Sequence, residues 1–330
     1  VGFVTSFATS IEEAAEECGE VRPSFIAGVP RVFEKIQEAI EANTALRGDV
    51  QQRVYDWAMG VGRKVSALRQ EGREPGALLA VQHRSAERLV FERIKQRLGG
   101  RLRFMLSGAA PLSKSTGEFF HAFGLLILEG YGLTETTGAS TLNTVDAFRF
   151  GTVGRALPGV DVKLQDDGEI LVRGRSVTSG YWQREEPDAF DDEGFFRTGD
   201  VGTLDADGYL TITDRKKDII VTAGGKNVAP ARVALRLTRS PYIDRAVVLG
   251  DRRKYLVALL EVDREAVFRW ADQHGLGGDR SVILRHPRVW QLLSTEVERA
   301  NEKLATFEQI KRFELLPSAL TQASGALTPT

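Results

Sequence analysis

Apolar residues recur along the chain with two different periods, which divide it into helical and strand-rich stretches. From Val32 to about Gly99 they fall on one helical stripe, so this stretch is predicted to be a long helical insert, broken near Gly72–Gly76 by glycine and proline. The preceding residues, 1 to about 35, predict a strand, a helix and a second strand, followed by the loop Gly28–Arg31.

Short apolar runs after Gly99 indicate a parallel sheet. Arg101–Leu106 and Leu125–Leu128 are predicted strands, and Ser113 is a suitable N-cap for a helix between them. A strand, helix and buried strand in this order predict parallel pairing with a right-handed crossover. Ligands of such sheets bind beyond the carboxyl ends of the strands, so the loops 107–111 and 129–137 are expected to lie side by side.

Residues 150–213 change to short alternating strands separated by Asp-Gly turns. The strands Val160–Leu164, Glu169–Val172 and Tyr209–Thr213 predict a small antiparallel sheet or distorted barrel. After Arg215 the pattern is that of a compact α+β unit. Its predicted elements are a helix after Pro230, strands Ile243–Leu249 and Leu256–Val262, and helices Arg264–His274 and Pro287–Lys303.

The composition indicates a class of protein but not its function. The chain is 42% hydrophobic and 27% charged with a net charge of -1, which fits a globular protein and excludes a general attraction to nucleic acid. Basic runs occur at Arg215–Lys217 and Arg252–Lys254, and a solvated face is the favoured interpretation of the second. Cys18 has no partner for an internal disulfide, which favours a reducing cytoplasm.

The segment Gly130–Thr137 combines residues suited to a nucleotide. Its glycines allow a ligand close to the backbone, Tyr131 offers a ring to a purine, and Thr134 can donate to a phosphate. Glu135 has the oxygen ligands that Mg²⁺ prefers. The alternative is a plain turn between a strand and a helix, with Glu135 as a charge at the helix start.

Two later residues are suited to a ribose. Asp200 can accept hydrogen bonds from both sugar hydroxyls, and Arg215 can donate to the same hydroxyls with a permanent charge. The alternative for Asp200 is an ordinary turn aspartate.

These segments, in this order, resemble the adenylate-forming superfamily of acyl-CoA synthetases, luciferases and adenylation domains, over nearly the whole chain. The stretches that carry the resemblance are Leu106–Leu112, Gly130–Thr137, Gly168–Gly174 with Gly180–Trp182, Phe196–Asp200 and Asp214–Pro230. Within the superfamily the chain is most similar to bacterial long-chain fatty acyl-CoA synthetases, through Val29–Ile36, the helical insert and Asp214–Asn227.

The resemblance implies an α/β fold in three parts. Residues 1–213 would be a partial AMP-binding domain, with the helical insert at 32–99 and the antiparallel part at 150–213. Residues 214–218 would be the hinge and 219–330 a small lid domain. The implied reaction joins a long-chain fatty acid to ATP with Mg²⁺ as acyl-adenylate, and then to coenzyme A.

The resemblance also implies roles for single residues. Catalytic roles would fall to Thr134 at the α-phosphate, Glu135 as the magnesium ligand, and Lys217 as the hinge residue. The adenylate would contact Gly108, Ala109, Ala110, Pro111, Tyr131, Gly132, Thr134, Asp200 and Arg215. Gly224, Gly225 and Lys226 would line the path of coenzyme A.

The chain departs from the family pattern at both ends. The glycine-rich phosphate loop and the C-terminal lysine of the family are absent; the first residues, Val1–Val4, read as a strand already in progress, and Leu327–Thr330 ends in an extended segment. We therefore expect a fragment that is nearly inactive alone. Val233 and Ala234 also stand where relatives usually have a carboxylate.

Two other functions stay open at this stage. One is an acyl-AMP ligase that loads a carrier protein, and the other is a non-catalytic nucleotide-binding module. Peripheral contact of the helical insert with the inner face of a membrane would suit a lipid substrate, although a core-facing stripe explains most amphipathic helices. No partner nucleic acid is expected, and the oligomeric state is left undetermined.

Overall fold

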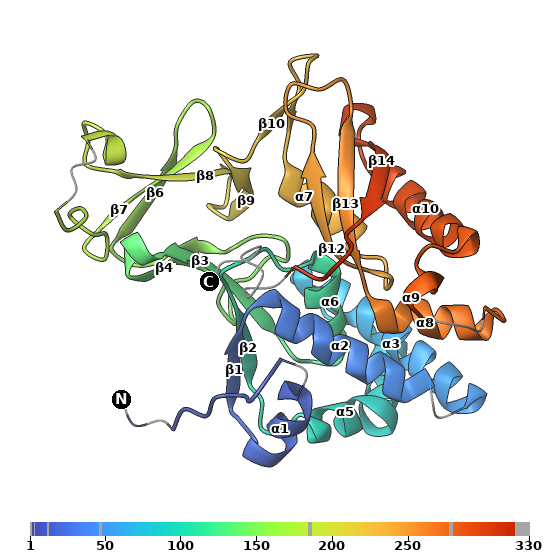
Figure 1. Ribbon diagram of the computed structural model, residues 1–330. Helices are drawn as coiled ribbons and strands as arrows, with labels where there is room; N and C mark the ends of the chain where they lie inside the picture. The colour runs from blue at the N-terminus through green and yellow to red at the C-terminus, as the bar shows by residue number, and fades with distance from the viewer. Residues whose placement is uncertain are drawn as a thin grey trace. The chain divides into compact units, whose positions relative to one another are not determined.

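The computed structural model describes residues 2, 4–11, 13–45, 48–183, 187–276 and 280–320 (Figure 1). The chain forms two units, each with its own core. Unit 1 comprises residues 1–198 and 202–212, and unit 2 comprises residues 199–201 and 213–330. The mixed α/β architecture agrees with the predicted fold class.

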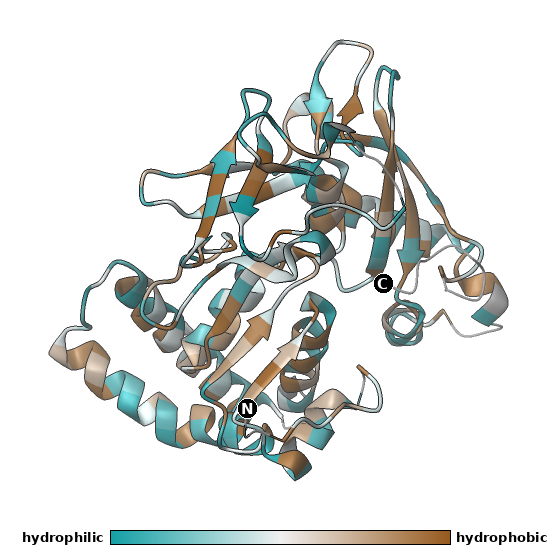
Figure 2. Cartoon of the chain, turned by 90° about the vertical axis from the view of Figure 1, so that its left-hand side faces the viewer, coloured by the Kyte–Doolittle hydropathy of each residue, from teal (hydrophilic) through white to brown (hydrophobic). Residues whose placement is uncertain are grey.

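The helical insert of unit 1 consists of several amphipathic helices whose apolar sides face one core. The helices of unit 1 are α1 (Ala14–Val21), α2 (Pro30–Ala45), α3 (Asp49–Gln70), α4 (Ala77–Ala86), the π-helical turn η1 (Glu87–Phe91), α5 (Glu92–Arg97) and α6 (Lys114–Ala122). Figure 2 shows hydrophilic and hydrophobic stripes along these helices. The predicted break at Gly72–Gly76 falls between α3 and α4 and is confirmed.

The strand predicted at the start of the chain is wrong for the residues that the structure describes there. Residues 4–10 form no strand, and the side chains of Val4 and Phe7 are 94% and 91% exposed. A strand needs a partner for its backbone groups, and no described strand pairs with this segment. Val1 and Phe3, like the predicted extended end Leu327–Thr330, lie outside the described residues.

A five-stranded sheet of order β1-β2-β3-β4-β5 is covered by these helices (Figure 1). Its strands are β1 (Phe25–Gly28), β2 (Phe104–Ser107), β3 (Ile127–Leu133), β4 (Gly138–Leu142) and β5 (Arg155–Ala156). β2 and β3 pair in parallel, as predicted, and β1 pairs in parallel with β2, whereas β3, β4 and β5 pair antiparallel. The core between sheet and helices includes Phe33, Phe91, Phe120 and Met105, all fully buried.

The loop predicted at 129–137 is mostly strand. β3 continues to Leu133 and pairs with β4, leaving only the 3₁₀ turn η2 (Thr134–Thr136) at the hairpin tip. A Cβ added at Gly132 would lie 1.8 Å from the carbonyl oxygen of Gly138, so pairing of the two strands requires glycine there. The glycines that suggested a loop are therefore part of a closely paired strand.

A buried carboxyl group lies on β3 beside β2. Glu129 is opposite Ser107 in the parallel pair, and its Oε2 accepts a hydrogen bond of 3.3 Å from the backbone N–H of Leu112. A second backbone N–H, of Gly151, also donates to it. Burial outweighs these bonds and raises the pKa of Glu129 to about 7.

The predicted antiparallel sheet follows, and most of its residues belong to unit 1. Its order is β6 (Val160–Leu164), β7 (Glu169–Gly174), β8 (Phe196–Leu204) and β9 (Leu210–Arg215). Ile170, Val172 and Leu210 form its core together with Tyr131 of β3. Tyr131 therefore joins the hairpin β3–β4 to this sheet.

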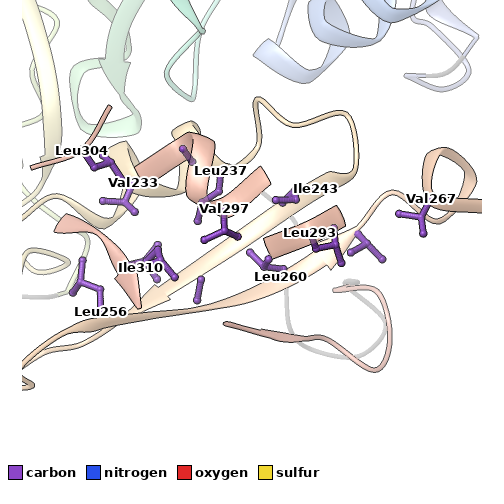
Figure 3. Close-up of a cluster of buried hydrophobic side chains, with 14 of the residues drawn as sticks. Val233, Leu237, Ile243, Leu256, Leu260, Val267, Leu293, Val297, Leu304 and Ile310 are labelled. Atoms are coloured by element: carbon purple, nitrogen blue, oxygen red, sulfur yellow. The ribbon is translucent and has the colours of Figure 1, made fainter. Parts of the chain in front are cut away.

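Unit 2 follows the predicted α+β pattern closely. Its elements are β10 (Ile220–Val221), β11 (Asn227–Val228), α7 (Pro230–Leu237), β12 (Ile243–Leu249), β13 (Leu256–Val262), α8 (Arg264–Gln273), α9 (Arg280–Ile283), α10 (Pro287–Asn301) and β14 (Ile310–Leu315). β12 and β13 have the predicted bounds. Figure 3 shows how side chains of α7 and α10, such as Leu237 and Val297, pack over Leu260 of β13. Val233 is fully buried in this core, which accounts for an apolar residue there.

We predict that Gly132→Ala destabilises the protein by about 3 kcal/mol, because its Cβ overlaps the backbone of β4. The measurement is urea unfolding followed by circular dichroism. Gly60→Ala in α3 is the matched control: nothing lies within 4 Å of its added Cβ, and alanine favours a helix by about 1 kcal/mol. Equal stability of the two variants would contradict the close pairing of β3 with β4.

We predict a pH-dependent effect of Glu129→Gln. The folded protein holds the proton of Glu129 more tightly than the unfolded chain, so wild-type stability is lost as pH rises from about 4.5 to about 7. Glutamine removes this loss, and the stability of the variant relative to wild type should rise by about 3 kcal/mol between pH 5 and pH 8. Urea titrations at both pH values test this. Glu74→Gln, an exposed position, is the control, and a parallel pH response of the Glu129 variant and wild type would refute the assignment.

Candidate functional site

The tip of the hairpin β3–β4 presents Thr134 and Glu135. The turn is closed by the buried side chain of Thr136, whose Oγ1 accepts from the N–H of Leu133 at 2.8 Å and donates to the carbonyl of Gly138 at 2.7 Å. Thr134 is exposed and Glu135 half-buried. A threonine hydroxyl and a carboxylate are thus held at the end of a rigid turn.

Tyr181 orients the carboxylate of Glu135. Its hydroxyl donates to Oε1 of Glu135 at 2.7 Å, and the backbone N–H of Thr178 donates to the carbonyl of Glu135 at 2.7 Å. Among the described residues no donor reaches Oε2, which suits a hard cation bound with phosphate and water. The sequence showed Gly180–Trp182 as a motif but gave Tyr181 no role.

The turn after β2 lies beside β3, as expected. A Cβ added at Gly108 would be 3.8 Å from the carbonyl oxygen of Gly130, in ordinary contact. Ala109 has φ +67°, Ala109, Ala110 and Pro111 are exposed, and the neighbouring Glu129 carboxylate fixes the end of the turn at Leu112. The backbone of 108–111 is therefore accessible and held in place.

Tyr131 and Gly132 lie on β3 just before this tip. The side chain of Tyr131 is 7% exposed and packs with Ile170, Val172 and Leu210. The close approach of β4 explains why residue 132 is glycine, without any contribution from a ligand. The two residues therefore have structural roles that sequence reasoning did not identify.

Asp200 and Arg215 come together within unit 2. Nε of Arg215 is 3.2 Å from Oδ1 of Asp200, whose side chain is buried while that of Arg215 is half exposed. The backbone N–H of Lys216 donates to the carbonyl of Gly199 at 2.7 Å, which aligns the two segments. A buried carboxylate paired with an accessible guanidinium can hold vicinal hydroxyl groups.

A second buried carboxylate, Asp214, precedes Arg215. Backbone N–H groups of Arg215 and Ala231 donate to it, yet burial and the nearby charges of Asp218 and Asp200 raise its pKa. Its Oδ2 has no hydrogen-bond partner among the described residues. Lys217 is exposed in the turn that follows. Its hinge role stays a prediction.

Gly224, Gly225 and Lys226 form the exposed tip of the hairpin β10–β11. The N–H of Gly225 donates to the carbonyl of Thr222 at 2.8 Å, and Gly225 has φ +72°, a conformation that favours glycine. Nothing lies within 4 Å of a Cβ added at Gly225, and at Gly224 only the Thr222 hydroxyl at 4.0 Å. The turn explains Gly225, whereas the space around Gly224 is open.

Two further properties concern the described part of the chain as a whole. None of its helices is long and apolar enough to cross a membrane. Nor do three or more metal-ligating side chains cluster anywhere in it.

Family models match both parts of the chain. The model described as AMP-binding enzyme matches residues 1–182, and that described as AMP-binding enzyme C-terminal domain matches residues 217–328. The long-chain-fatty-acid–CoA ligase FadD15 of Mycobacterium tuberculosis is 39% identical over 98% of this chain and 54% of that protein. The mouse long-chain-fatty-acid–CoA ligase ACSBG1 is also 39% identical, over 94% of this chain and 46% of that protein.

Solved structures share the fold. The adenylation domain of a carboxylate reductase from Mycobacterium chelonae matches 96% of this chain and 45% of that chain, with a TM-score of 0.69 and 24% identity. The o-succinylbenzoate CoA synthetase of Bacillus subtilis matches 96% of this chain and 52% of that chain, with a TM-score of 0.62 and 20% identity. The chain spans about half the length of the curated relatives it matches. By the match of its sequence to these family models, the chain belongs to the AMP-binding enzyme family.

Proposed function

We propose that this chain forms the AMP-binding and C-terminal parts of an ATP-dependent long-chain fatty acid:CoA ligase. The observation that carries the proposal is the 39% identity, over 98% of the chain, to a protein named as such a ligase. In the first step the carboxylate oxygen of the fatty acid attacks the α-phosphorus of ATP, and pyrophosphate leaves. In the second step the thiol of coenzyme A attacks the acyl carbonyl, and AMP leaves.

Adenylate binding is assigned to the backbone of 108–111 and to the pair of Asp200 and Arg215. The accessible backbone of 108–111 would hold the adenine, and the buried ring of Tyr131 would support the strand beside it. Asp200 and Arg215 would bind the ribose hydroxyls, and the burial of Asp200 favours this role because a shielded carboxylate makes stronger hydrogen bonds.

The residues at the hairpin tip are assigned to the phosphates of ATP. Thr134 would donate to the α-phosphate, and Glu135, oriented by Tyr181, would hold Mg²⁺ through its free oxygen. Bound there, the ion would offset the negative charge that develops on the phosphates. The protein's own contribution is to keep the carboxylate in place before the substrate arrives.

The domain rearrangement between the two reaction steps is assigned to the hinge. We propose that Lys217, within 214–218, is the residue about which the domain 219–330 turns relative to 1–213. Gly224, Gly225 and Lys226 would then line the path of the CoA thiol, and the open space around Gly224 supports a close approach of the ligand. The cytoplasm is the proposed location, with fatty acid, ATP and CoA as partners, and membrane contact through the helical insert would remain peripheral.

One prediction concerns the reaction. Pyrophosphate release with palmitate and ATP, and palmitoyl-CoA formation on adding CoA, are measured for the complete gene product and for the chain of 330 residues. We expect turnover by the complete product and a far lower rate for the chain alone. Release of pyrophosphate without any CoA thioester would instead favour transfer to a carrier protein, and absence of ATP binding would favour a non-catalytic module.

A separate prediction concerns the ribose contact. Asp200→Asn in the complete gene product should raise KM for ATP about 10- to 100-fold, because hydrogen bonds to a charged acceptor are lost. Asp166→Asn, an exposed turn position, should change it less than twofold. Circular dichroism verifies that both variants fold. An unchanged KM for ATP in a folded Asp200 variant would remove this residue from the site.

A further inference from the structure

A groove between the helices of unit 1 has no role in the proposed function. It has a volume of about 1270 Å³ and is lined by residues of α1, the second half of α2, the start of α3, η1 and α5. Volumes of about 300–1000 Å³ are usual for sites that bind small molecules. The groove is therefore large enough for a ligand with a long chain.

The groove lies at the opposite end of the parallel strands from the candidate functional site. α1 ends at Val21 before β1 begins, and α5 ends at Arg97 before β2 begins, so both helices lie at the amino-terminal ends of these strands (Figure 1). α2 begins at Pro30, beyond the carboxyl end of β1, and the groove residue Asn43 is about 20 Å farther along its axis. The turn 108–111, by contrast, follows the carboxyl end of β2.

A π-helical turn places three arginines on one side of the helix beside the groove. α4, η1 and α5 form one continuous helix, in which the N–H of Glu92 donates to the carbonyl of Glu87 five residues earlier. Residues five apart lie on nearly the same side of a π turn, whereas in an α-helix they point about 140° apart. Arg88 and Arg93 are five apart across this turn, and Arg97 follows four residues later. All three line the groove, and π turns inside α-helices are frequent at functional sites.

The three guanidinium groups are exposed and unpaired. Lys95 of the same helix is neutralised by Glu87, with Nζ 2.6 Å from Oε1. Within the described part of the chain, no carboxylate forms an ion pair with Arg88, Arg93 or Arg97. These three groups are therefore available to an anionic ligand, and guanidinium groups bind carboxylates through charge-assisted, often bidentate, hydrogen bonds.

The charged lining of the groove has an excess of one positive charge. Its three arginines are accompanied by two exposed carboxylates, Glu16 and Glu92, and the other described residues that line it are neutral. One excess positive charge matches a head group with a single negative charge. A head group with several phosphates would carry more negative charge than the groove offsets.

The rest of the lining is largely aliphatic and partly open to solvent. Ile36 and Ile94 are buried, whereas Val50 and Leu89 are 70% and 51% exposed. An alkyl chain in the groove would cover these exposed side chains, and burial of each methylene group raises affinity by up to about fourfold. An aliphatic groove with unpaired guanidinium groups fits a single-chain anionic amphiphile.

We propose that this groove binds a long-chain fatty acid, with its carboxylate at Arg88, Arg93 and Arg97 and its alkyl chain along the aliphatic side chains of α2 and α3. It is a second fatty acid site, apart from the one at which adenylation would take place. The choice of a fatty acid among anionic amphiphiles rests on the proposed function, in which a fatty acid is the substrate. The existence of the site rests only on the shape and charge of the groove.

Direct binding to the chain of 330 residues tests the proposal without any turnover. Calorimetry compares dodecanoate, hexanoate, dodecyltrimethylammonium and dodecanoyl-CoA, each below its critical micelle concentration. We expect dodecanoate to bind more than about tenfold more tightly than hexanoate, which has the shorter chain, and than dodecyltrimethylammonium, which has the opposite charge. Equal affinity for the cationic amphiphile, tighter binding of dodecanoyl-CoA, or no binding of dodecanoate would each overturn the proposal.

A photoreactive palmitate with a diazirine on its alkyl chain locates the bound ligand. After irradiation of its complex with the chain, peptide mass spectrometry should find the label on α2, α3 or α5. Label confined to peptides that contain residues 107–111 or 130–142 would place the fatty acid at the candidate functional site instead and refute the proposal.

Variants test the contribution of the arginines. Arg93→Ala with Arg97→Ala should weaken dodecanoate binding about fivefold or more, because two charge-assisted hydrogen-bond donors are lost. Lys64→Ala with Arg84→Ala, two exposed cations outside the groove, is the matched control and should change it less than twofold. Leu89→Asp, at an exposed position of the lining, should also weaken binding. Circular dichroism verifies folding, and folded variants that bind dodecanoate like wild type would reject the groove as the site.

The complete gene product separates this proposal from the proposed function. If it forms palmitoyl-CoA while the arginine variant binds dodecanoate like wild type, the ligase function stands and the groove site is rejected. If it forms no palmitoyl-CoA while the chain binds dodecanoate in the groove, the ligase function is rejected and the groove site stands. Binding to anionic vesicles that the arginine variant loses, without binding of dodecanoate, would identify a membrane contact and overturn the proposal.

Discussion

The pairing of β3 with strands on both sides is the constraint on which unit 1 depends. β2 lies parallel to its first half and β4 antiparallel to its second half, so one strand takes part in two kinds of sheet. Close pairing with β4 is allowed only because Gly132 lacks a side chain. The position of Thr134 and Glu135 at the tip follows from this pairing.

β3 also links the cores of unit 1. Ile127 packs beneath the helices, whereas Tyr131 packs into the antiparallel sheet with Ile170 and Leu210. Movement of β3 would therefore disturb the helical core, the hairpin and the antiparallel sheet together. Such coupling gives a binding site a rigid base, since its residues are supported by packing on several sides.

Buried carboxylates occur twice beside the segments that carry the candidate site residues. Glu129 and Asp214 both have raised pKa values because burial disfavours their charged forms, and both accept hydrogen bonds from backbone N–H groups. Each fixes a loop next to residues assigned to the nucleotide. Buried groups with shifted pKa values are common at functional sites and also occur in structural networks.

Much of the fold and part of the site could be predicted from the sequence. β12 and β13 have the predicted bounds because each is a short, largely apolar run that ends at a turn residue, Gly250 or Asp263. The motifs identified the family and the pairing of Asp200 with Arg215. The sequence did not predict that β3 continues through its glycine-rich end, because residues 130–133 have no strand periodicity of their own. This part of β3 is a strand because the small residues of β4 pair with it. The sequence by itself determined the local elements and the chemical groups available, because these depend on neighbours in the chain. Only the tertiary structure decided that Tyr181 orients Glu135 and that α2, α3 and α5 line a common groove, because these arrangements form between segments that meet only when the chain folds.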